Sequence, residues 1–338
     1  MGQIIRNRNE VMQGPSPEAI EAIQNFDPSK AAYYAEGYYD SALINELSTR
    51  SGVAKDRIIV CYGAEDFLRA AFDSLDSKTD SVLTHEYYYG YYKAYLEGKN
   101  VTLHTFKMKE GSDSFSFDID NCLEQYNEHQ PKVLIIASPN NPTGNSINST
   151  ELQRILNAVD PKTLVILDEA YWGFDTQYDE KAFLHLIERY PNLAILRSFS
   201  KYYALAGLRI GFVLCGADVK KIVRYENLYL GMSRLLEDVA VAALNSENYY
   251  KAVAKEIEDE RIRLTTEINK LSHFKAYESK ANLVFMHADS DVEEKLENLL
   301  PTLETLSIKR SFGNYWRITI GLPDINGQLL EILRKAEA

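Results

Sequence analysis

One short stretch of the chain combines an amine with groups suited to binding a phosphate. Lys201 ends the run Ser198-Phe199-Ser200-Lys201, and Arg209 follows eight residues later. A buried lysine can lose its proton and act as an amine nucleophile. Hydroxyls and a guanidinium suit a doubly charged phosphate. An isolated Ser-x-Ser-Lys run is more often a surface turn, so the interpretation depends on the rest of the chain.

An amine beside a phosphate site matches the two anchors of pyridoxal phosphate (PLP), which takes a Schiff base at one end and a phosphate contact at the other. Two more segments carry groups for its ring. The turn Ser138–Gly144 could present the Asn141 amide to a ligand oxygen, or be a simple turn. Asp168 could pair with a pyridinium nitrogen, or cap a helix, and Tyr171 could bond the ring hydroxyl.

A glycine turn in Gly63-Ala64-Glu65-Asp66 leads from an apolar run into a helical pattern. Such a turn offers backbone N–H groups and the positive end of a helix dipole to an anion. The acidic pair Glu65 and Asp66 must then point away from a phosphate, or act as helix caps.

Short β-branched runs alternate with helical patterns from about residue 40 to 215. This alternation predicts an α/β fold, with a large domain built on a mostly parallel seven-stranded sheet between helices. Ligands of such folds bind at the carboxyl ends of the strands. That rule places the loops after Cys61, Ala137, Leu167 and Arg197 on one rim. The predicted strands are Arg57–Cys61, Ser81–Leu83, Val101–Thr105, Lys132–Ala137, Leu164–Leu167, Leu193–Arg197 and Ile210–Leu214.

The C-terminal part predicts a small α+β domain. It begins with a charged helical pattern over Asn248–Leu271. The later elements are a strand at Leu283–His287, a helix at Val292–Leu300, strands at Thr305–Lys309 and Tyr315–Ile320, and a terminal helix after Asp324. We expect the segment Asn9–Gln24 to join this unit. The predicted domains are 30–245 for the large one, and 1–29 with 246–338 for the small one.

Composition excludes several classes of protein. A net charge of −12 argues against nucleic-acid binding. The polar N-terminus lacks a signal-peptide core, and no apolar run is long enough for a membrane span, so we expect a cytoplasmic protein. The three cysteines lie far apart, as expected of reduced core residues. The six histidines show no metal-ligand spacing, and no metal site is predicted.

In order along the chain, these motifs resemble the class I/II aminotransferases of fold type I, and most closely the histidinol-phosphate aminotransferase group. The resemblance runs from residue 9 to 321, nearly the whole chain. Its carriers are Asn9-Glu10, Gly14-Pro15-Ser16-Pro17, Gly63–Asp66, Asn140–Gly144, Asp168–Tyr171, Ser198–Lys201, Ala206–Arg209 and Trp316–Gly321.

The resemblance implies a role for each matching residue. Lys201 would be the Schiff-base lysine, Asp168 the partner of the pyridine nitrogen, and Asn141 with Tyr171 would hold the ring oxygen. An aromatic stacked on the ring falls at Tyr87, with its register among the six tyrosines of 87–95 open by a residue or two. The phosphate would be held by Ser198, Ser200, Arg209 and the backbone N–H groups of Ala64 and Glu65.

The resemblance also implies a homodimer and a set of substrate contacts. Tyr34, or Tyr33, would reach the cofactor phosphate of the partner subunit. Arg317 would bind the substrate carboxylate, while Arg310 is either a second anion contact or a solvated strand end. Gln13 stands where the family has a tyrosine facing the substrate, and this departure leaves the amino donor open.

The expected reaction is transfer of an amino group from histidinol phosphate, or an aromatic or related amino acid, to a 2-oxo acid such as 2-oxoglutarate. The main alternative is a PLP-dependent decarboxylase of a phosphorylated amino acid, resembling threonine-phosphate decarboxylase. A ligand-binding regulator is disfavoured because Lys201 is present and no DNA-binding segment precedes the motifs. A nicotinamide dehydrogenase is disfavoured because no Gly-x-Gly-x-x-Gly follows an early strand.

Overall fold

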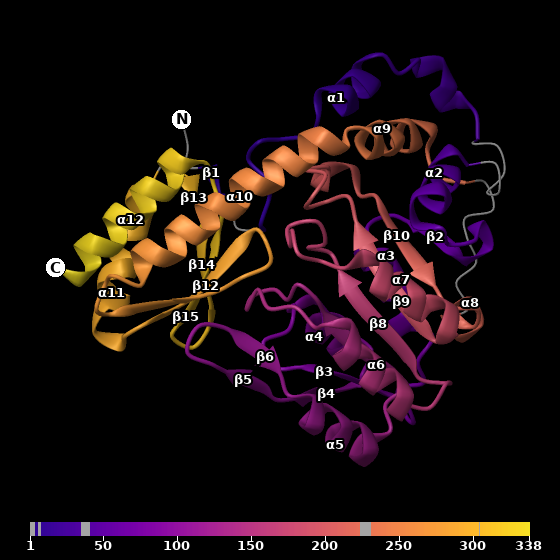
Figure 1. The fold of residues 1–338 in the computed structure, drawn as a ribbon, viewed down its shortest axis with the longest axis horizontal. Helices are drawn as coiled ribbons and strands as arrows, with labels where there is room; N and C mark the ends of the chain where they lie inside the picture. Colours follow the sequence, from indigo (N-terminus) through magenta and orange to yellow (C-terminus); the bar gives the residue numbers. More distant parts are fainter. Residues whose placement is uncertain (1–3, 6–7, 35–40, 224–230, 304) are drawn as a thin grey trace.

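A computed structural model describes residues 4–5, 8–34, 41–223, 231–303 and 305–338 (Figure 1). A sheet of seven strands and a sheet of four strands organise this part of the chain, and two pairs of short strands accompany them. The helix α10 (Glu247–Ile268) runs from the side of the larger sheet to the smaller one, which lies with α11 (Ser290–Leu299) and α12 (Pro323–Glu337) (Figure 1).

The larger sheet has the strand order β2-β10-β9-β8-β7-β3-β4. Only β10 runs antiparallel to its neighbours, and the other contacts between adjacent strands are parallel. The predicted mostly parallel seven-stranded sheet is therefore confirmed. Its strands are β2 (Ile58–Cys61), β3 (Ser81–His85), β4 (Thr102–Phe106), β7 (Val133–Ala137), β8 (Leu164–Glu169), β9 (Leu193–Ser198) and β10 (Gly211–Cys215).

Apolar side chains of this sheet pack into two separate hydrophobic cores, one on each face of the sheet. Along β7, Val133 and Ile135 enter one core, and Leu134 and Ile136 enter the other. Successive residues of a strand face opposite sides, so a continuous apolar run is what a sheet covered on both faces needs. The first core is covered by α3 (Ala64–Asp73), α4 (Tyr91–Gly98) and α8 (Val219–Val223). The second is covered by α2 (Ala42–Ser51), α5 (Ile119–His129), α6 (Ser149–Ala158) and α7 (Glu180–Arg189).

The helix α3 begins directly after β2. Gly63 is its N-cap residue and has φ of +79°, a conformation that glycine adopts without steric penalty. The first N–H groups of a helix have no partner within it. The amides of Ala64 and Glu65 therefore lie at the carboxyl end of β2, as the motif predicts.

The smaller sheet has the order β11-β12-β15-β14, and all its strands are antiparallel. It contains one strand that we did not predict, β11 (Phe274–Tyr277), with β12 (Leu283–Ala288), β14 (Ile308–Phe312) and β15 (Tyr315–Thr319). The stretch predicted as one strand at Thr305–Lys309 is divided. Its first part, β13 (Thr305–Leu306), leaves this sheet and pairs in parallel with β1 (Ile4–Ile5).

The N-terminal segment contacts both the smaller sheet and a helix beside the larger one. Asn9 contacts the smaller sheet, because Thr319 Oγ1 donates a hydrogen bond to its Oδ1. The helix α1 (Pro17–Gln24) instead packs on α9 (Arg234–Asn245), beside the larger sheet. The division of the chain into a large domain of residues 30–245 and a small domain of residues 1–29 and 246–338 stays a prediction.

A short hairpin also connects the two sheets. It is formed by β5 (Met108–Glu110) and β6 (Phe115–Phe117), which follow β4. The ring of Phe115 lies 4.8 Å from that of Tyr277, and Tyr315 donates to Glu110 over 2.9 Å. These contacts fix the smaller sheet beside the rim of the larger one.

Two simpler expectations can be compared with the structure. The three cysteines, Cys61, Cys122 and Cys215, are buried and unpaired. Within the described ranges, none of the helices combines the length and the apolar surface that crossing a membrane requires.

Candidate active site

The predicted site residues follow the carboxyl ends of adjacent strands. Asn141 lies in the turn after β7, Asp168 is the second-last residue of β8, and Ser198 is the last residue of β9. Lys201 follows three residues after Ser198. Because β7, β8 and β9 are parallel neighbours, these residues gather at one edge of the sheet.

Asp168 is buried and held by two donors. Tyr92 Oη on α4 donates to its Oδ2 over 2.5 Å, and the Ala170 N–H donates to its Oδ1 over 3.1 Å. Burial raises the pKa of the Asp168 carboxyl, while the Tyr92 hydrogen bond acts in the opposite direction. The carboxylate is thus fixed in direction and tuned by a phenol from another element.

Lys201 carries a half-buried amine at the same edge. Its Nζ donates to the backbone oxygen of Arg8 and lies 5.8 Å from the ring centre of Tyr171. Burial lowers the pKa of the Lys201 ammonium to about 8; Glu10 raises it, and Arg317 and Arg209 lower it. The amine is therefore easier to deprotonate than an exposed lysine, as a nucleophile requires.

The groups predicted to hold a phosphate contact one another. Ser198 Oγ accepts from the Ser200 N–H over 3.0 Å, and Arg209 Nη1 donates to Ser200 Oγ over 3.2 Å. Arg209 Nη2 also lies 3.3 Å from Glu65 Oε2. The Glu65 side chain therefore pairs with this guanidinium, so an anion at the helix start would compete with it for Arg209.

Two glycines allow this close approach. A Cβ at Gly63 would lie 2.6 Å from Arg209 Nη2, and one at Gly211 would lie 2.8 Å from the Ala64 nitrogen. Both separations are shorter than the contacts that Cβ atoms make with non-bonded atoms in proteins. The backbones of β10 and of the start of α3 come together because Gly211 has no side chain, and Gly63 lets the Arg209 guanidinium lie against the start of α3.

Arg317 brings a buried positive charge from the smaller sheet to this edge. It lies on β15, and its Nη1 donates to Asn141 Oδ1 over 3.2 Å. Its charge acts on both Lys201 and Tyr171, and burial lowers its own pKa. An arginine beside a nucleophilic amine is suited to binding an anionic substrate.

The structure corrects the predicted position of the stacking aromatic. The Tyr87 ring lies among Phe115, Phe312 and Tyr315, at the junction with the smaller sheet. Tyr89 lies at the site instead: its Oη donates to Glu65 Oε1 over 2.9 Å, and burial together with the charges of Glu65 and Asp168 raises its pKa. The tyrosine-rich sequence could not distinguish these residues, because the chain at Tyr87 takes a positive φ of 54° before α4 begins.

The structure also corrects the weaker of the two predicted anion contacts. The Arg310 guanidinium pairs with Glu293 at 3.0 Å and Glu297 at 3.1 Å, both on α11. These two carboxylates satisfy its charge on the outer side of the smaller sheet. Arg310 is the partly exposed strand residue of our alternative interpretation.

Three other residues named in the sequence analysis, Gln13, Tyr34 and Tyr33, show no side-chain contact with the site residues within the described part of the chain. Gln13 is half-buried, and its backbone oxygen accepts from Tyr249 Oη over 3.2 Å. The Tyr34 side chain is 75% exposed, and Tyr33 is 71% exposed. Their roles at the substrate and at a partner subunit stay predictions.

Sequence reasoning gave no role to three residues that the structure places at the site. They are Asn9 and Glu10, which we used only as motif carriers, and Tyr92, one of the six clustered tyrosines; Tyr89 lay within the open register of the stacking tyrosine. The spacing of Tyr92 could have indicated its role. Tyr92 lies four residues before Leu96, on the same buried face of the helix, and a buried tyrosine hydroxyl needs a hydrogen-bond partner inside the protein.

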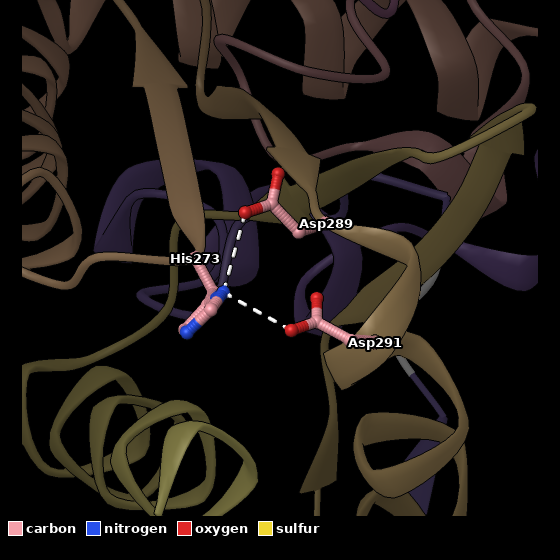
Figure 2. Close-up of side chains that lie close together, drawn as sticks. All are labelled: His273, Asp289 and Asp291. Atoms are coloured by element: carbon pink, nitrogen blue, oxygen red, sulfur yellow. Dashed lines mark hydrogen bonds and ion pairs between the residues drawn. The ribbon is translucent and has the colours of Figure 1, made fainter.

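A separate polar cluster lies on the smaller sheet (Figure 2). His273 Nδ1 is 3.3 Å from Asp289 Oδ2 and 3.5 Å from Asp291 Oδ2, and the two carboxylates are half exposed or more. The histidine spacing did not predict this cluster, because it forms where β11 begins and β12 ends. Contacts between the imidazole and the two exposed carboxylates account for this cluster.

Comparison with known proteins gives the family. Residues 6–319 match the model for aminotransferase class I and II. The chain is 31% identical over 328 residues to histidinol-phosphate aminotransferase 2 of Archaeoglobus fulgidus, covering 97% of this chain and 91% of the relative. It is 32% identical over 331 residues to histidinol-phosphate aminotransferase of Staphylococcus carnosus, covering 96% and 88%.

Solved structures show the same fold. Histidinol-phosphate aminotransferase from Sinorhizobium meliloti in complex with pyridoxal-5'-phosphate superposes with a TM-score of 0.85 at 24% identity, covering 98% of this chain and 91% of that one. L-threonine-O-3-phosphate decarboxylase from Porphyromonas gingivalis superposes with a TM-score of 0.79 at 19% identity, covering 98% of each chain.

The fold and the gathered amine, carboxylate and arginines define an enzyme that works on a PLP cofactor. The chain belongs to the class I and II aminotransferases, and it is a PLP-dependent aminotransferase. The residues present fit this cofactor. Lys201 offers an amine of lowered pKa, Asp168 a buried carboxylate, and Gly63 lets the Arg209 guanidinium lie against the start of α3.

The Tyr92 hydroxyl provides a first test of the site. We expect Tyr92→Phe to raise the pKa of Asp168 further and to weaken PLP binding by about 10-fold, because a hydrogen bond to a buried charged group is lost. Titration of the apoenzyme with PLP, followed by fluorescence, measures this. The control is Tyr95→Phe, since Tyr95 on the same helix donates to Asp73 instead. Equal losses in both variants would contradict the assignment.

The lowered pKa of Lys201 predicts a pH profile. The rate at which the apoenzyme combines with PLP should rise with pH and be half-maximal near pH 8, because only the neutral amine reacts. Glu10→Gln should move the midpoint to lower pH, since the Glu10 charge favours the ammonium form. Stopped-flow absorbance measures the rate, and Glu21→Gln on α1 is the control. A midpoint near that of an exposed lysine would contradict the prediction.

Proposed function

We propose that this enzyme transfers an amino group from histidinol phosphate, or an aromatic or related amino acid, to a 2-oxo acid such as 2-oxoglutarate. The observation that carries the proposal is the buried Arg317 guanidinium, which acts electrostatically on the Lys201 amine and contacts Asn141. It provides a positive charge where a substrate's anionic group would lie. The histidinol-phosphate aminotransferases among its relatives, at 31% and 32% identity, support histidinol phosphate as the first donor to test.

The site residues would hold the cofactor at three points. Ser198, Ser200, Arg209 and the amides of Ala64 and Glu65 would bind its phosphate. Asp168 would face its pyridine nitrogen, and Asn141 with Tyr171 its ring oxygen. Tyr89, rather than Tyr87, would lie against the ring. When bound, the cofactor supplies an electron sink for the pair left when the substrate loses its Cα proton.

The remaining work belongs to the chain's own groups. Lys201 Nζ would hold the cofactor before the donor arrives, and then take the Cα proton as a general base and return it as a general acid. Asp168 would keep the ring nitrogen protonated, aided by Tyr92, which fixes the direction of the carboxylate. Arg317 would orient the substrate so that its reacting carbon faces Lys201.

The same anion site would serve both halves of the reaction. The donor and the acceptor bind in turn, so the Arg317 guanidinium would face the carboxylate of each substrate that carries one. A planar guanidinium donates two parallel hydrogen bonds to the oxygens of a carboxylate or a phosphate. The proposed homodimer would add Tyr34 of the partner subunit to the phosphate contacts, and the 75% exposure of the Tyr34 side chain leaves it free for such a role.

The function is tested by the visible absorption of the purified holoenzyme. We expect L-histidinol phosphate to bleach the yellow band and 2-oxoglutarate to restore it, with L-phenylalanine and O-phospho-L-threonine as the other donors tried. Lys201→Ala should bind PLP without turnover. Release of carbon dioxide from O-phospho-L-threonine would favour the decarboxylase, and a band that no donor changes would overturn the donor assignment.

Arg317 gives a second test with a matched control. Arg317→Ala should lower kcat/KM for 2-oxoglutarate by about 10- to 100-fold, because charge-assisted hydrogen bonds to a carboxylate are lost. The loss should be smaller for a donor that carries only a phosphate. Arg310→Ala should leave both values within about twofold, since Arg310 is paired with α11. Steady-state kinetics, with each substrate varied in turn, measures kcat/KM for both variants. Equal losses for the two substrates in Arg317→Ala would contradict its role at the carboxylate.

A further inference from the structure

Asn9 connects three parts of the molecule through its own polar atoms. Its Nδ2 donates to Tyr171 Oη over 2.7 Å, and its Oδ1 accepts from Thr319 Oγ1 over 2.8 Å. Its backbone oxygen accepts from Asn282 Nδ2 over 3.1 Å. Asn9 is fully buried, so water does not replace any of these partners. One residue of the N-terminal segment thus joins the loop after β8 to the smaller sheet.

The direction of these hydrogen bonds determines where the Tyr171 proton can point. The Thr319 hydroxyl donates to the amide oxygen of Asn9, so the amide nitrogen faces Tyr171. A phenol has a single proton, and its oxygen here already accepts from Asn9. The O–H of Tyr171 must therefore donate elsewhere. Tyr171 is itself buried beside Lys201, whose Nζ lies 5.8 Å from its ring centre.

We propose that Asn9 is a positioning residue that directs the Tyr171 hydroxyl proton toward the cofactor's ring oxygen. This inference rests on the proposed role of Tyr171 at that oxygen. Asn9 would act only through Tyr171. Since Thr319 on β15 holds the Asn9 amide, the smaller sheet also determines the orientation of a group at the edge of the larger one.

The backbone at Asn9 explains why few residue types can do this. Its φ is +59°, in the left-handed region that glycine, asparagine and aspartate tolerate best. Of these three, only asparagine offers an N–H to Tyr171 while accepting from Thr319. Aspartate has the same shape but two acceptors. Asn9→Asp therefore reverses one hydrogen bond with little change in shape.

The experiment follows the pH at which the visible absorption of the bound cofactor changes. A donor to the ring oxygen stabilises its deprotonated form, so losing that donor raises the midpoint. In Asn9→Asp the carboxylate captures the Tyr171 proton, and we expect the midpoint to rise by roughly one to two pH units. Tyr171→Phe should raise it similarly. The charged and titratable groups around Tyr171 are Arg317, Asp168, Glu10, Lys201, Tyr89 and Tyr92, and all are kept.

A double-mutant cycle separates proton capture from the added charge of the aspartate. In the Tyr171→Phe background there is no phenol proton to capture, so Asn9→Asp should add little further shift. A shift of equal size in both backgrounds would overturn the proposal, because it would be an effect of charge alone. If Tyr171→Phe by itself leaves the midpoint unchanged, the proposed function of Tyr171 fails, which is a different outcome.

Thr319 provides a second route if Asn9→Asp does not fold. Thr319→Val removes the donor that orients the Asn9 amide, while Thr319→Ser keeps the hydroxyl. We expect Thr319→Val to raise the midpoint and Thr319→Ser to leave it unchanged. The Thr319→Val shift should disappear when Tyr171→Phe is added. An unchanged midpoint in Thr319→Val would overturn the proposal.

Discussion

Two neighbouring carboxylates, Asp168 and Glu169, are buried at the end of β8, and each must find partners inside the protein. A buried charge without a partner is destabilising by several kcal/mol. Because neighbouring strand residues face opposite sides, Glu169 meets Arg197 at 2.8 Å and Tyr178 on one face, whereas Asp168 meets Tyr92 on the other. Glu180, at the start of α7, completes the Arg197 pair. Helices on both faces are therefore tied to a single strand end, and the candidate site is built on the Asp168 side of it.

The site also depends on how the two sheets meet. The larger sheet supplies Lys201, Asp168 and the groups proposed to bind a phosphate, and the smaller sheet supplies Arg317. Two polar contacts cross this junction at the site, from Arg317 to Asn141 and from Thr319 through Asn9 to Tyr171. Any shift of the smaller sheet must change both contacts. A movement of Arg317 on substrate binding would thus change the positions of Asn141 and Tyr171, the residues proposed to hold the cofactor ring.

Family membership determines the class of chemistry, and the residues near the substrate must determine the donor. Those two sets come from different parts of the chain. The proposed cofactor contacts follow the strand ends of the larger sheet, whereas the proposed substrate contacts Arg317 and Gln13 belong to the smaller sheet and the N-terminal segment. An enzyme arranged in this way can change its donor without disturbing Lys201 or Asp168.

The sequence by itself determined the class of fold, because the alternation of short apolar runs and helical patterns specifies a parallel sheet covered on both faces. It also predicted the candidate site residues Lys201, Asp168 and Arg209, which lie near a strand end or a glycine turn, and Arg317, which only the family resemblance indicated. Tertiary structure alone decided which of the clustered tyrosines lies at the site: a left-handed backbone turns Tyr87 toward the smaller sheet, and Tyr89 and Tyr92 face Glu65 and Asp168. It likewise decided that Arg310 is occupied by α11 and that Asn9 meets Tyr171 across 162 positions of sequence. Local pattern cannot show such partners, because a hydrogen bond between distant residues exists only once both sheets are packed.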